Sequence, residues 1–334
     1  MTVRRGMAKP IFPRYIERYG GVRSMKVRHG PVGVHMFDRT SGLNILVDEI
    51  SVPPENWSVA PRYVSFALTN SCELNCSYCF APKFSARLPF ASVKLWAREL
   101  DSEGCLGVGF GGGEPTLYPG FADLCRELHR ETKLAITMTT HGHRFSLGLA
   151  NQLAGFVDFI RLSMDGVGST YERMRGRPFA AFEDKLRVVR DTTRFGINYV
   201  VNDDTIDDLA AAADFAFANG AEELLLLPET GPDSVPVISP NTLRRLSDWA
   251  RENHSRCRLA TSAHCGVLMD VPILPVSDPE HASYEFMHVD ASGVLKLSAF
   301  TQAGIPLGDS RSIIDSVRQL RIIRARENGG GGGN

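Results

Sequence analysis

Three cysteines, Cys72, Cys76 and Cys79, lie within eight residues of this sequence in the spacing C-x3-C-x2-C. They directly follow the apolar run Tyr63–Leu68, so they occupy the loop after a predicted strand. Four cysteine thiolates are the usual ligands of a cubane iron–sulfur cluster, and three thiolates would leave one iron with an open coordination position. The loop therefore predicts a single 4Fe–4S cluster that can bind a further ligand.

Two other interpretations of the cysteine loop stay open at this point. A zinc loop would need a fourth cysteine or histidine nearby, and His141 or His143 could supply it from elsewhere in the chain. Three packed thiols are the remaining alternative.

The cysteine content also indicates the redox compartment. Seven cysteines are an odd number, which fits a metal site in a reducing compartment better than a disulfide framework. Residues 1–13 contain arginines but no apolar h-region, and no later apolar run approaches the roughly 20 residues of a membrane-spanning helix. We therefore expect a cytoplasmic protein with no membrane contact.

Length and charge narrow the class of protein. A chain of 334 residues that is 43% hydrophobic can bury one large core or a barrel with a smaller appended unit. Lysine and arginine number 37 against 38 aspartates and glutamates, so the chain lacks the broad positive field that a nucleic-acid partner would require.

Strands and helices alternate from residue 61 to residue 230. Apolar residues within 93–100 recur at i, i+3, i+4 and i+7, the period of an amphipathic helix. Six βα-type units predict an α/β fold, a partial (β/α)6 TIM-like barrel whose chemistry sits on the loops after the strands. The predicted strands are 63–68, 106–110, 134–139, 159–163, 197–201 and 223–227, and the later predicted helices are 121–131, 147–154, 182–192 and 206–219.

The two ends of the chain follow other patterns. Residues 1–60 form an N-terminal extension with a predicted hairpin, 32–37 against 43–47. Residues 231–328 form a predicted small C-terminal α+β extension. Its expected elements are a helix over 241–252, a hairpin around Ser292-Gly293 and a helix over 313–326, and residues 329–334 are expected to form a flexible glycine-rich tail.

The cysteine loop resembles the cluster motif of the radical S-adenosylmethionine (SAM) superfamily. The aromatic Phe80 after the last cysteine is also common in that family. The resemblance implies that the open iron binds the amino and carboxylate groups of SAM.

A second motif, Gly112-Gly113-Glu114-Pro115, is similar to the GGEP motif of the same family. It implies that the backbone and Glu114 hold the SAM ammonium. Glycines let backbone oxygens approach a ligand closely, and a carboxylate complements a cation. A simple Gly-Pro turn is the alternative if the segment is considered alone.

Later strand ends carry further matches. Thr140-His141-Gly142 stands where many members have T-N-G, with a solvated turn as the alternative. Ser163-Met164-Asp165-Gly166 resembles the family's S-x-D-G segment. Ser163 and Asp165 could contact the SAM ribose or carboxylate, or cap the next helix.

Three more candidates follow from position. Arg173, Arg175 and Arg177 crowd one loop, where Arg175 could pair with the SAM carboxylate or an anionic substrate, unless the loop is simply solvated. Asn202 could bind the ribose. Leu226 could wall the adenine, although core packing explains it equally well.

The C-terminal region resembles the auxiliary-cluster region of the SPASM and twitch subfamilies in a degraded form. Cys265-Gly266 resembles its opening, whereas Ser298 stands where a cysteine ligand is expected. An auxiliary cluster would need Cys257, Cys265 and unusual partners, so we expect only one cluster. Cys265 is then a structural thiol or a hydrogen-atom donor in the active site.

The resemblance implies an enzyme that cleaves SAM reductively to a 5′-deoxyadenosyl radical, which abstracts a hydrogen from the substrate. We expect modification of a ribosomally made peptide, as in peptide maturases. The alternatives are oxidation or rearrangement of a small metabolite, such as a sugar or amino acid, and a non-catalytic iron–sulfur regulatory protein. The expected electron donor is a low-potential protein such as flavodoxin or ferredoxin.

Overall fold

The computed structural model describes residues 25–231, 235–255, 258–271, 283–308 and 311–329. Cys257, residues 1–24 and the predicted tail beyond Gly329 lie outside these residues. None of the described helices has the length and apolar character that a bilayer span requires.

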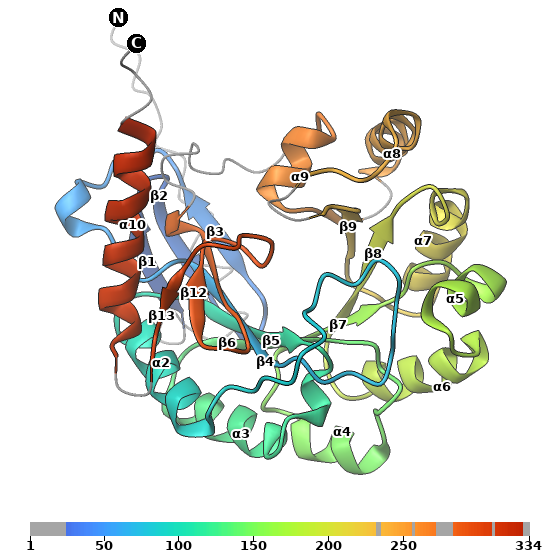
Figure 1. Ribbon diagram of the computed structural model, residues 1–334, viewed down its shortest axis with the longest axis horizontal. Coiled ribbons are helices and arrows are strands. Elements are labelled where there is room, and N and C mark those ends of the chain that lie inside the picture. The colour runs from blue at the N-terminus through green and yellow to red at the C-terminus, as the bar shows by residue number, and fades with distance from the viewer. Residues whose placement is uncertain (1–24, 232–234, 256–257, 272–282, 309–310, 330–334) are drawn as a thin grey trace, which may run out of the picture.

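Six strands at the centre of one large sheet pair in parallel, each with its neighbour in the sequence. Helices cover the outer face of this curved sheet (Figure 1). The partial α/β barrel predicted from the sequence is therefore confirmed. The strands are β4 (Tyr63–Thr69), β5 (Gly107–Gly112), β6 (Ala135–Thr140), β7 (Phe159–Ser163), β8 (Phe195–Val201) and β9 (Leu224–Pro228), and the helices are α2 (Phe90–Ser102), α3 (Phe121–Glu131), α4 (Leu147–Leu153), α5 (Gly168–Arg175), α6 (Phe179–Arg190) and α7 (Leu209–Ala218).

The sheet extends beyond the six central strands at both edges, to ten strands in total. Beyond β9 lies β10 (Leu259–Ala260), and β11 (Phe286–Val289) pairs in parallel with β4. The predicted hairpin around Ser292-Gly293 is present, because β11 pairs antiparallel with β12 (Val294–Lys296), which then pairs with β13 (Ile305–Pro306). The pairing of β11 with β4 was not predicted from the sequence.

A small antiparallel sheet precedes the barrel and contains the predicted hairpin. Its strands are β1 (Lys26–Gly30), β2 (Gly33–Phe37) and β3 (Asn44–Val47). The buried Arg28 of β1 donates hydrogen bonds to the carbonyl oxygens of Ala60, at 2.8 Å, and Tyr284, at 2.7 Å. This arginine ties the small sheet to the segments that precede β4 and β11. The remaining helices are α8 (Pro240–Asn253), α9 (Ala263–Leu268) and α10 (Ile313–Gly329).

The two faces of the central sheet differ because successive side chains of a strand point to opposite sides. In β4, Val64, Phe66 and Leu68 are fully buried in the core under the helices, whereas Tyr63 and Ser65 on the inner face are half-buried. The Tyr63 side chain lies over Gly109, where a Cβ would be only 1.8 Å from the Tyr63 hydroxyl oxygen. Glycine at position 109 therefore makes room for the Tyr63 side chain on the inner face.

One predicted helix differs in detail. The segment predicted as a single helix, 206–219, begins as the 3-10 turn η4 (Ile206–Asp208) before α7 starts. A 3-10 turn has 3.0 residues per turn instead of 3.6, so it rotates the residues that follow. In α7 itself Ala212, Ala213 and Ala216 are buried, whereas Ala210 is exposed.

Replacement of a core aromatic in the strand before the cysteine loop should destabilise the whole sheet. Phe66 is fully buried, with its ring centroid 6.2 Å from that of Phe110. We expect Phe66→Ala to lower the free energy of unfolding by about 3–5 kcal/mol. The matched control is Phe84→Ala, because the Phe84 side chain is exposed and its loss should cost about 0.5 kcal/mol or less. Urea unfolding midpoints of both variants would test this, and equal midpoints would contradict it.

Candidate active site

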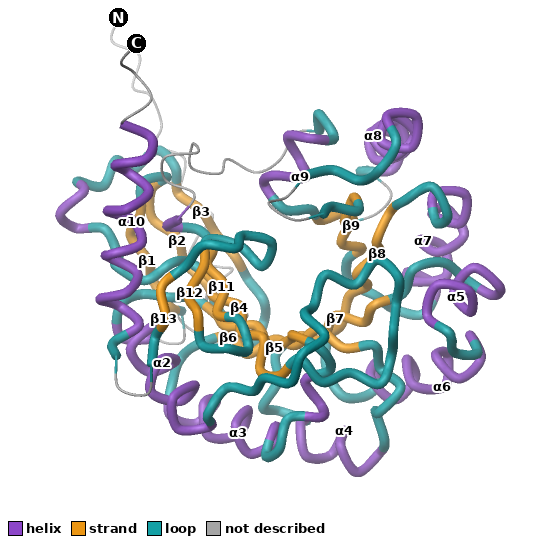
Figure 2. Tube along the Cα trace, viewed as in Figure 1, coloured by secondary structure: helices purple, strands orange, loops and turns teal. Residues whose placement is uncertain are grey.

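The cysteine loop begins at the end of β4 and returns beside it. Asn70 N donates to the Ala86 carbonyl at 3.0 Å, and Leu88 N donates to the Leu68 carbonyl at 3.0 Å. Between these bonds the loop extends over the ends of the neighbouring strands (Figure 2). Cys72 is exposed, and Cys76 and Cys79 are half-buried, so all three thiols lie at the carboxyl-end edge of the barrel rather than in its core.

The glycine-rich end of β5 packs directly against the start of the cysteine loop. Gly113 N donates to the Thr69 carbonyl at 2.7 Å, and Glu114 N donates to the Ser71 carbonyl at 2.8 Å. Gly112 has a φ of +110°, and a Cβ at Gly113 would lie 2.2 Å from the Ser71 carbonyl oxygen. Both positions therefore require glycine because the loop backbone approaches so closely.

Glu114 is fully buried and its carboxylate connects two strand ends. Oε1 accepts hydrogen bonds from the Thr116 hydroxyl at 2.7 Å and from the Thr140 hydroxyl at 2.8 Å. Oε2 accepts from His141 N at 3.1 Å. Pro115 begins the short turn η3 (Pro115–Leu117) that places Thr116. Glu114 thus holds the end of β6 against the end of β5, and its contact with a SAM ammonium stays a prediction.

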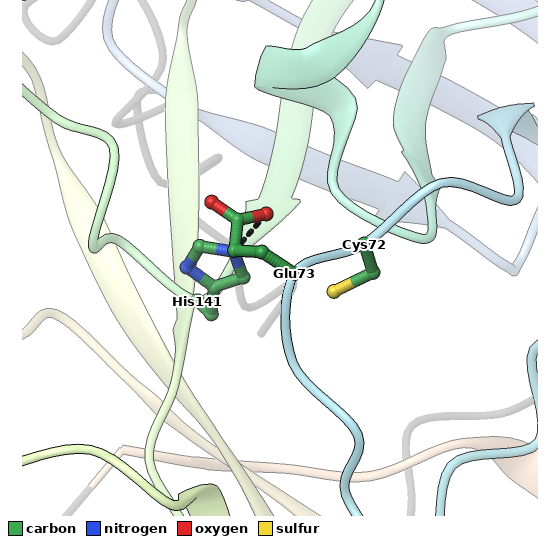
Figure 3. Close-up of side chains that lie close together, drawn as sticks. All are labelled: Cys72, Glu73 and His141. Atoms are coloured by element: carbon green, nitrogen blue, oxygen red, sulfur yellow. Dashed lines mark ion pairs between the residues drawn. The ribbon is translucent and has the colours of Figure 1, made fainter.

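His141 links this carboxylate to the cysteine loop. Its ring is 4% exposed, which contradicts the solvated-turn interpretation of Thr140-His141-Gly142. The ring Nε2 lies 3.2 Å from Glu114 Oε2 and 3.3 Å from Glu73 Oε2, as Figure 3 shows for Glu73. One ligand atom each from Cys72, Glu73 and His141 lie within 4.8 Å of one another. No local motif marks Glu73, because its partner His141 is 68 positions away in the sequence.

A second buried carboxylate, Asp165, lies on the other side of the loop. Its Oδ1 accepts from Val200 N at 2.8 Å, and its Oδ2 forms an ion pair with Arg175 and accepts from the Tyr78 hydroxyl. The guanidinium of Arg175 lies 5.5 Å from the Tyr78 ring centroid and donates to Cys76 Sγ at 3.7 Å. Arg175 therefore touches the cysteine loop itself and is not part of a solvated basic loop.

Burial and charge fix the protonation of this group. Burial raises the pKa of Tyr78 far above its usual range, and the Asp165 carboxylate raises it further. Burial opposes the charge of Arg175, but the anionic neighbours, Asp165 first, raise the net pKa above the ordinary value. Tyr78 is thus a neutral donor and Arg175 a cation at neutral pH. Burial also raises the pKa of the Cys72 thiol, which a bound metal would oppose.

Ser163 and Asn198 are ladder partners in β7 and β8 and are half-buried on the inner face. The Oδ1 atom of Asn198 is buried and has no hydrogen-bond partner in the described part of the chain. Buried polar atoms are nearly always satisfied, so this oxygen fits a position where a ligand donates. Asn198 was missed because it lies inside a strand, where the sequence offers no motif.

Two predicted SAM contacts have other partners in the structure. Asn202 Oδ1 accepts from the backbone nitrogens of Asp204 and Thr205 at 3.0 Å, and its amide donates to Glu229 at 2.7 Å. Leu226 is 1% exposed within the core cluster, which fits the packing alternative. Its neighbours in β9 are half-buried on the other face of the sheet.

The C-terminal region also touches the cysteine loop. The Phe300 ring centroid lies 4.8 Å from that of Phe80. Ser298 Oγ accepts from the backbone nitrogens of Phe300 and Thr301, both at 3.2 Å, so it shapes this turn where a ligand cysteine was expected. Cys265 is 7% exposed in α9, and burial raises the pKa of its thiol. That burial fits a structural thiol, and its role as a hydrogen-atom donor stays a prediction.

The residues present fit an iron–sulfur cluster with a polar ligand beside it. The donor set offers three thiols on one loop, at the mouth of the barrel, with a guanidinium beside Cys76. Besides the Asn198 oxygen, two further polar atoms, Arg175 Nε and His141 Nε2, are buried without a hydrogen bond of good geometry in the described residues. Unsatisfied polar atoms around a thiol loop are what a polar cofactor would complete.

A parallel β/α barrel with a three-cysteine loop after its first barrel strand defines a class of iron–sulfur proteins. The model of the Radical SAM superfamily matches residues 66–216, which run from β4 into α7 and include all three cysteines. Residues 66–216 of this chain therefore form a radical SAM domain.

Relatives of this chain have different named functions. The AdoMet-dependent heme synthase of Methanosarcina barkeri is 26% identical over 219 residues, 62% of this chain and 62% of the relative. The sporulation killing factor maturation protein SkfB of Bacillus subtilis is 25% identical over 211 residues, 57% of this chain and 49% of the relative. The chain thus spans less than two thirds of either relative's length.

The fold is similar to that of a solved enzyme. The structure of Streptococcus suis SuiB bound to precursor peptide SuiA superimposes with a TM-score of 0.69 at 16% identity, over 87% of this chain and 86% of that chain. At this identity the similarity establishes the shared fold alone.

The close backbone contact at Gly113 should be essential for the shape of the cysteine loop. We expect Gly113→Ala to push the loop away from β5 and to lower the iron bound per chain after anaerobic reconstitution by half or more. The matched control is Gly111→Ala, because a Cβ at Gly111 has no atom within 4 Å. Iron analysis of the two variants tests this. Full iron loading of Gly113→Ala would show that the loop does not depend on the contact.

Proposed function

We propose that this protein is a radical SAM enzyme in which Cys72, Cys76 and Cys79 hold a 4Fe–4S cluster. The observation that carries the proposal is the loop itself, with three thiols at the carboxyl-end edge of the barrel beside the buried Arg175–Asp165 pair. When bound, the cluster would supply an electron that breaks the S–C5′ bond of SAM and yields the 5′-deoxyadenosyl radical. The electron would come from a low-potential protein such as flavodoxin or ferredoxin.

The residues around the loop would bind and orient SAM. The backbone of Gly112 and Gly113 would approach the amino acid part of SAM, with Glu114 fixing the position of both strand ends. Ser163 and Asn198 would offer polar atoms on the inner face, and the unsatisfied Asn198 oxygen supports this role. The proposal thus shifts the predicted contact at β8 from Asn202, whose side chain is already bonded, to Asn198 inside the strand.

Arg175 would contact the cysteine loop around the cluster rather than bind the SAM carboxylate. Its guanidinium is 10% exposed and is shared among Asp165, the Tyr78 ring and Cys76. A cation that donates to a ligand sulfur stabilises the reduced, more negative state of a cluster. We therefore assign Arg175 a tuning and positioning role.

We propose a ribosomally made peptide as the substrate. SkfB is named as a maturation protein, and SuiB, which shares this fold, was solved with a precursor peptide. A Cβ at Gly111 of β5 would meet no atom within 4 Å, so the end of this strand leaves open space on the inner face where a substrate would lie. These observations support the peptide without identifying it.

A small metabolite is the second candidate, and the heme synthase relative is the observation that favours it. The two candidates differ in what stimulates SAM cleavage. If the first candidate is right, a precursor peptide encoded beside the gene should increase 5′-deoxyadenosine formation. The peptide itself should then change in mass. Stimulation by a metabolite, with the peptide unchanged in mass, would favour the second candidate.

Removal of one loop cysteine should abolish both the cluster and the chemistry. After anaerobic reconstitution with iron and sulfide, the wild-type protein should bind about four irons per chain and release 5′-deoxyadenosine from SAM with dithionite. Cys76→Ala should lose most of the iron and nearly all of the nucleoside. Cys125→Ala is the control, because this cysteine is buried in α3, away from the loop. Zinc in place of iron, or a Cys76→Ala variant with normal activity, would disprove the proposal.

Replacement of Arg175 should make the cluster harder to reduce. Loss of the cation and of its contact with Cys76 should shift the midpoint potential of the reconstituted cluster to more negative values, on the order of tens of millivolts. Arg175→Met tests this by redox titration followed by electron paramagnetic resonance. Arg173→Met is the control, since Arg173 contacts only the Asp204 carbonyl among its described partners. An unchanged potential in Arg175→Met would remove the tuning role.

A further inference from the structure

A groove of about 570 Å³ lies beside the cysteine loop, on the side of α6. Its lining includes Glu73, His143, Arg144, Arg177 and Lys185. We propose that this groove is the docking surface for the acidic face of the small electron-transfer protein that reduces the cluster. The inference rests on the proposed function and names the place where the partner of that reaction binds.

The groove is basic in a chain whose formal net charge is only −1. Arg177 and Lys185 have no ion pair among the described residues, whereas exposed arginines elsewhere, such as Arg251 and Arg318, pair with a carboxylate three positions away. Glu73, the only carboxylate of the lining, already lies 3.6 Å from Arg144 and 3.3 Å from His141. The groove therefore presents uncompensated positive charge to a partner.

The groove adjoins the cluster ligands. Glu73 is the residue after Cys72, and Arg177 is two residues beyond Arg175, which contacts Cys76. An electron donor seated in the groove would thus lie next to the cluster loop, with little protein between donor and ligands.

A second hollow, of about 340 Å³, continues the surface on the other side of the same loop. It is lined by Cys72, Glu73 and Lys83, among other residues, and Lys83 has no ion pair within the described part of the chain. Within the described residues, uncompensated cations therefore flank the loop on both sides. This breadth suits a protein face better than a single small anion.

The location also separates the donor from the substrate. The groove is lined from α6 and from the loop between β6 and α4, whereas the substrate is proposed to bind on the inner face of the sheet. Both α4 and α6 lie on the outer face (Figure 1). A donor could dock while SAM and substrate occupy the barrel. Electron-transfer encounters are weak and small in area, and complementary charge sets their rate of association. The reaction step is the passage of one electron, which oxidises the donor by one electron and reduces the cluster by one.

Charge reversal in the groove tests the proposal. The variant is Arg177→Glu with Lys185→Glu, and the control is Arg251→Glu with Arg318→Glu, which changes the charge equally at exposed, paired arginines. Anaerobic 5′-deoxyadenosine formation is measured with dithionite and, separately, with flavodoxin reduced by NADPH and its reductase. We expect the KM for flavodoxin to rise tenfold or more in the groove variant only. The dithionite-driven rate should stay within twofold of wild type in both variants.

Each outcome is decisive. An unchanged KM for flavodoxin in the groove variant would overturn the proposal, and an equal loss of the dithionite-driven rate would assign the groove to an anionic substrate instead. Direct titration of flavodoxin onto the reconstituted proteins at low salt should show weaker binding to the groove variant alone. That titration needs no turnover, so it tests the docking surface even if the wild-type protein forms no 5′-deoxyadenosine. Failure of the wild-type protein to form the nucleoside would contradict the proposed function instead.

Discussion

The buried carboxylate of Glu114 is the constraint on which the site depends. A charge without water costs several kcal/mol unless it is fully hydrogen-bonded, so Glu114 must keep its donors from Thr116, Thr140 and His141. Meeting that requirement brings the end of β6 to the end of β5. Because Gly113 and Glu114 also donate to the start of the cysteine loop, the same carboxylate fixes where the first thiol lies.

Asp165 fixes the cysteine loop on its other side, as Glu114 does at its start. Its ion pair with Arg175 is buried, and Tyr78 closes the group from within the loop. The cysteine loop is thus held at two points, by the contacts of Glu114 and by those of Asp165. Each set stabilises the loop only when all its partners are present, because removing one partner of a buried pair leaves an uncompensated charge. Two buried carboxylates, one after β5 and one after β7, thereby give a fixed geometry to a segment with no regular secondary structure of its own.

Much of this was predictable from the sequence, where the signal is local. Each of the signals that were used lies within ten residues of sequence: the cysteine spacing, the motif from Gly112 to Pro115 and the period of each strand. The barrel was predicted from the order of these local signals. Contacts between distant segments were not predictable, which is why Glu73 and Asn198 were missed. Helix α5 was missed as well, because its eight residues are mostly polar and bury only Thr170, Tyr171 and Met174.

The pairing of β11 with β4 has a consequence for how the protein assembles. The strand that leads into the cysteine loop has one edge covered by β5 and the other by residues 286–289, more than 200 positions later in the chain. During synthesis that edge stays open until the last quarter of the chain has emerged, and open strand edges template aggregation. Contacts between such distant segments also slow folding. The strand that presents the cysteines is therefore among the last parts of the barrel to be enclosed. Iron delivered to a newly made chain would meet a loop whose supporting strand is still unpaired on one side.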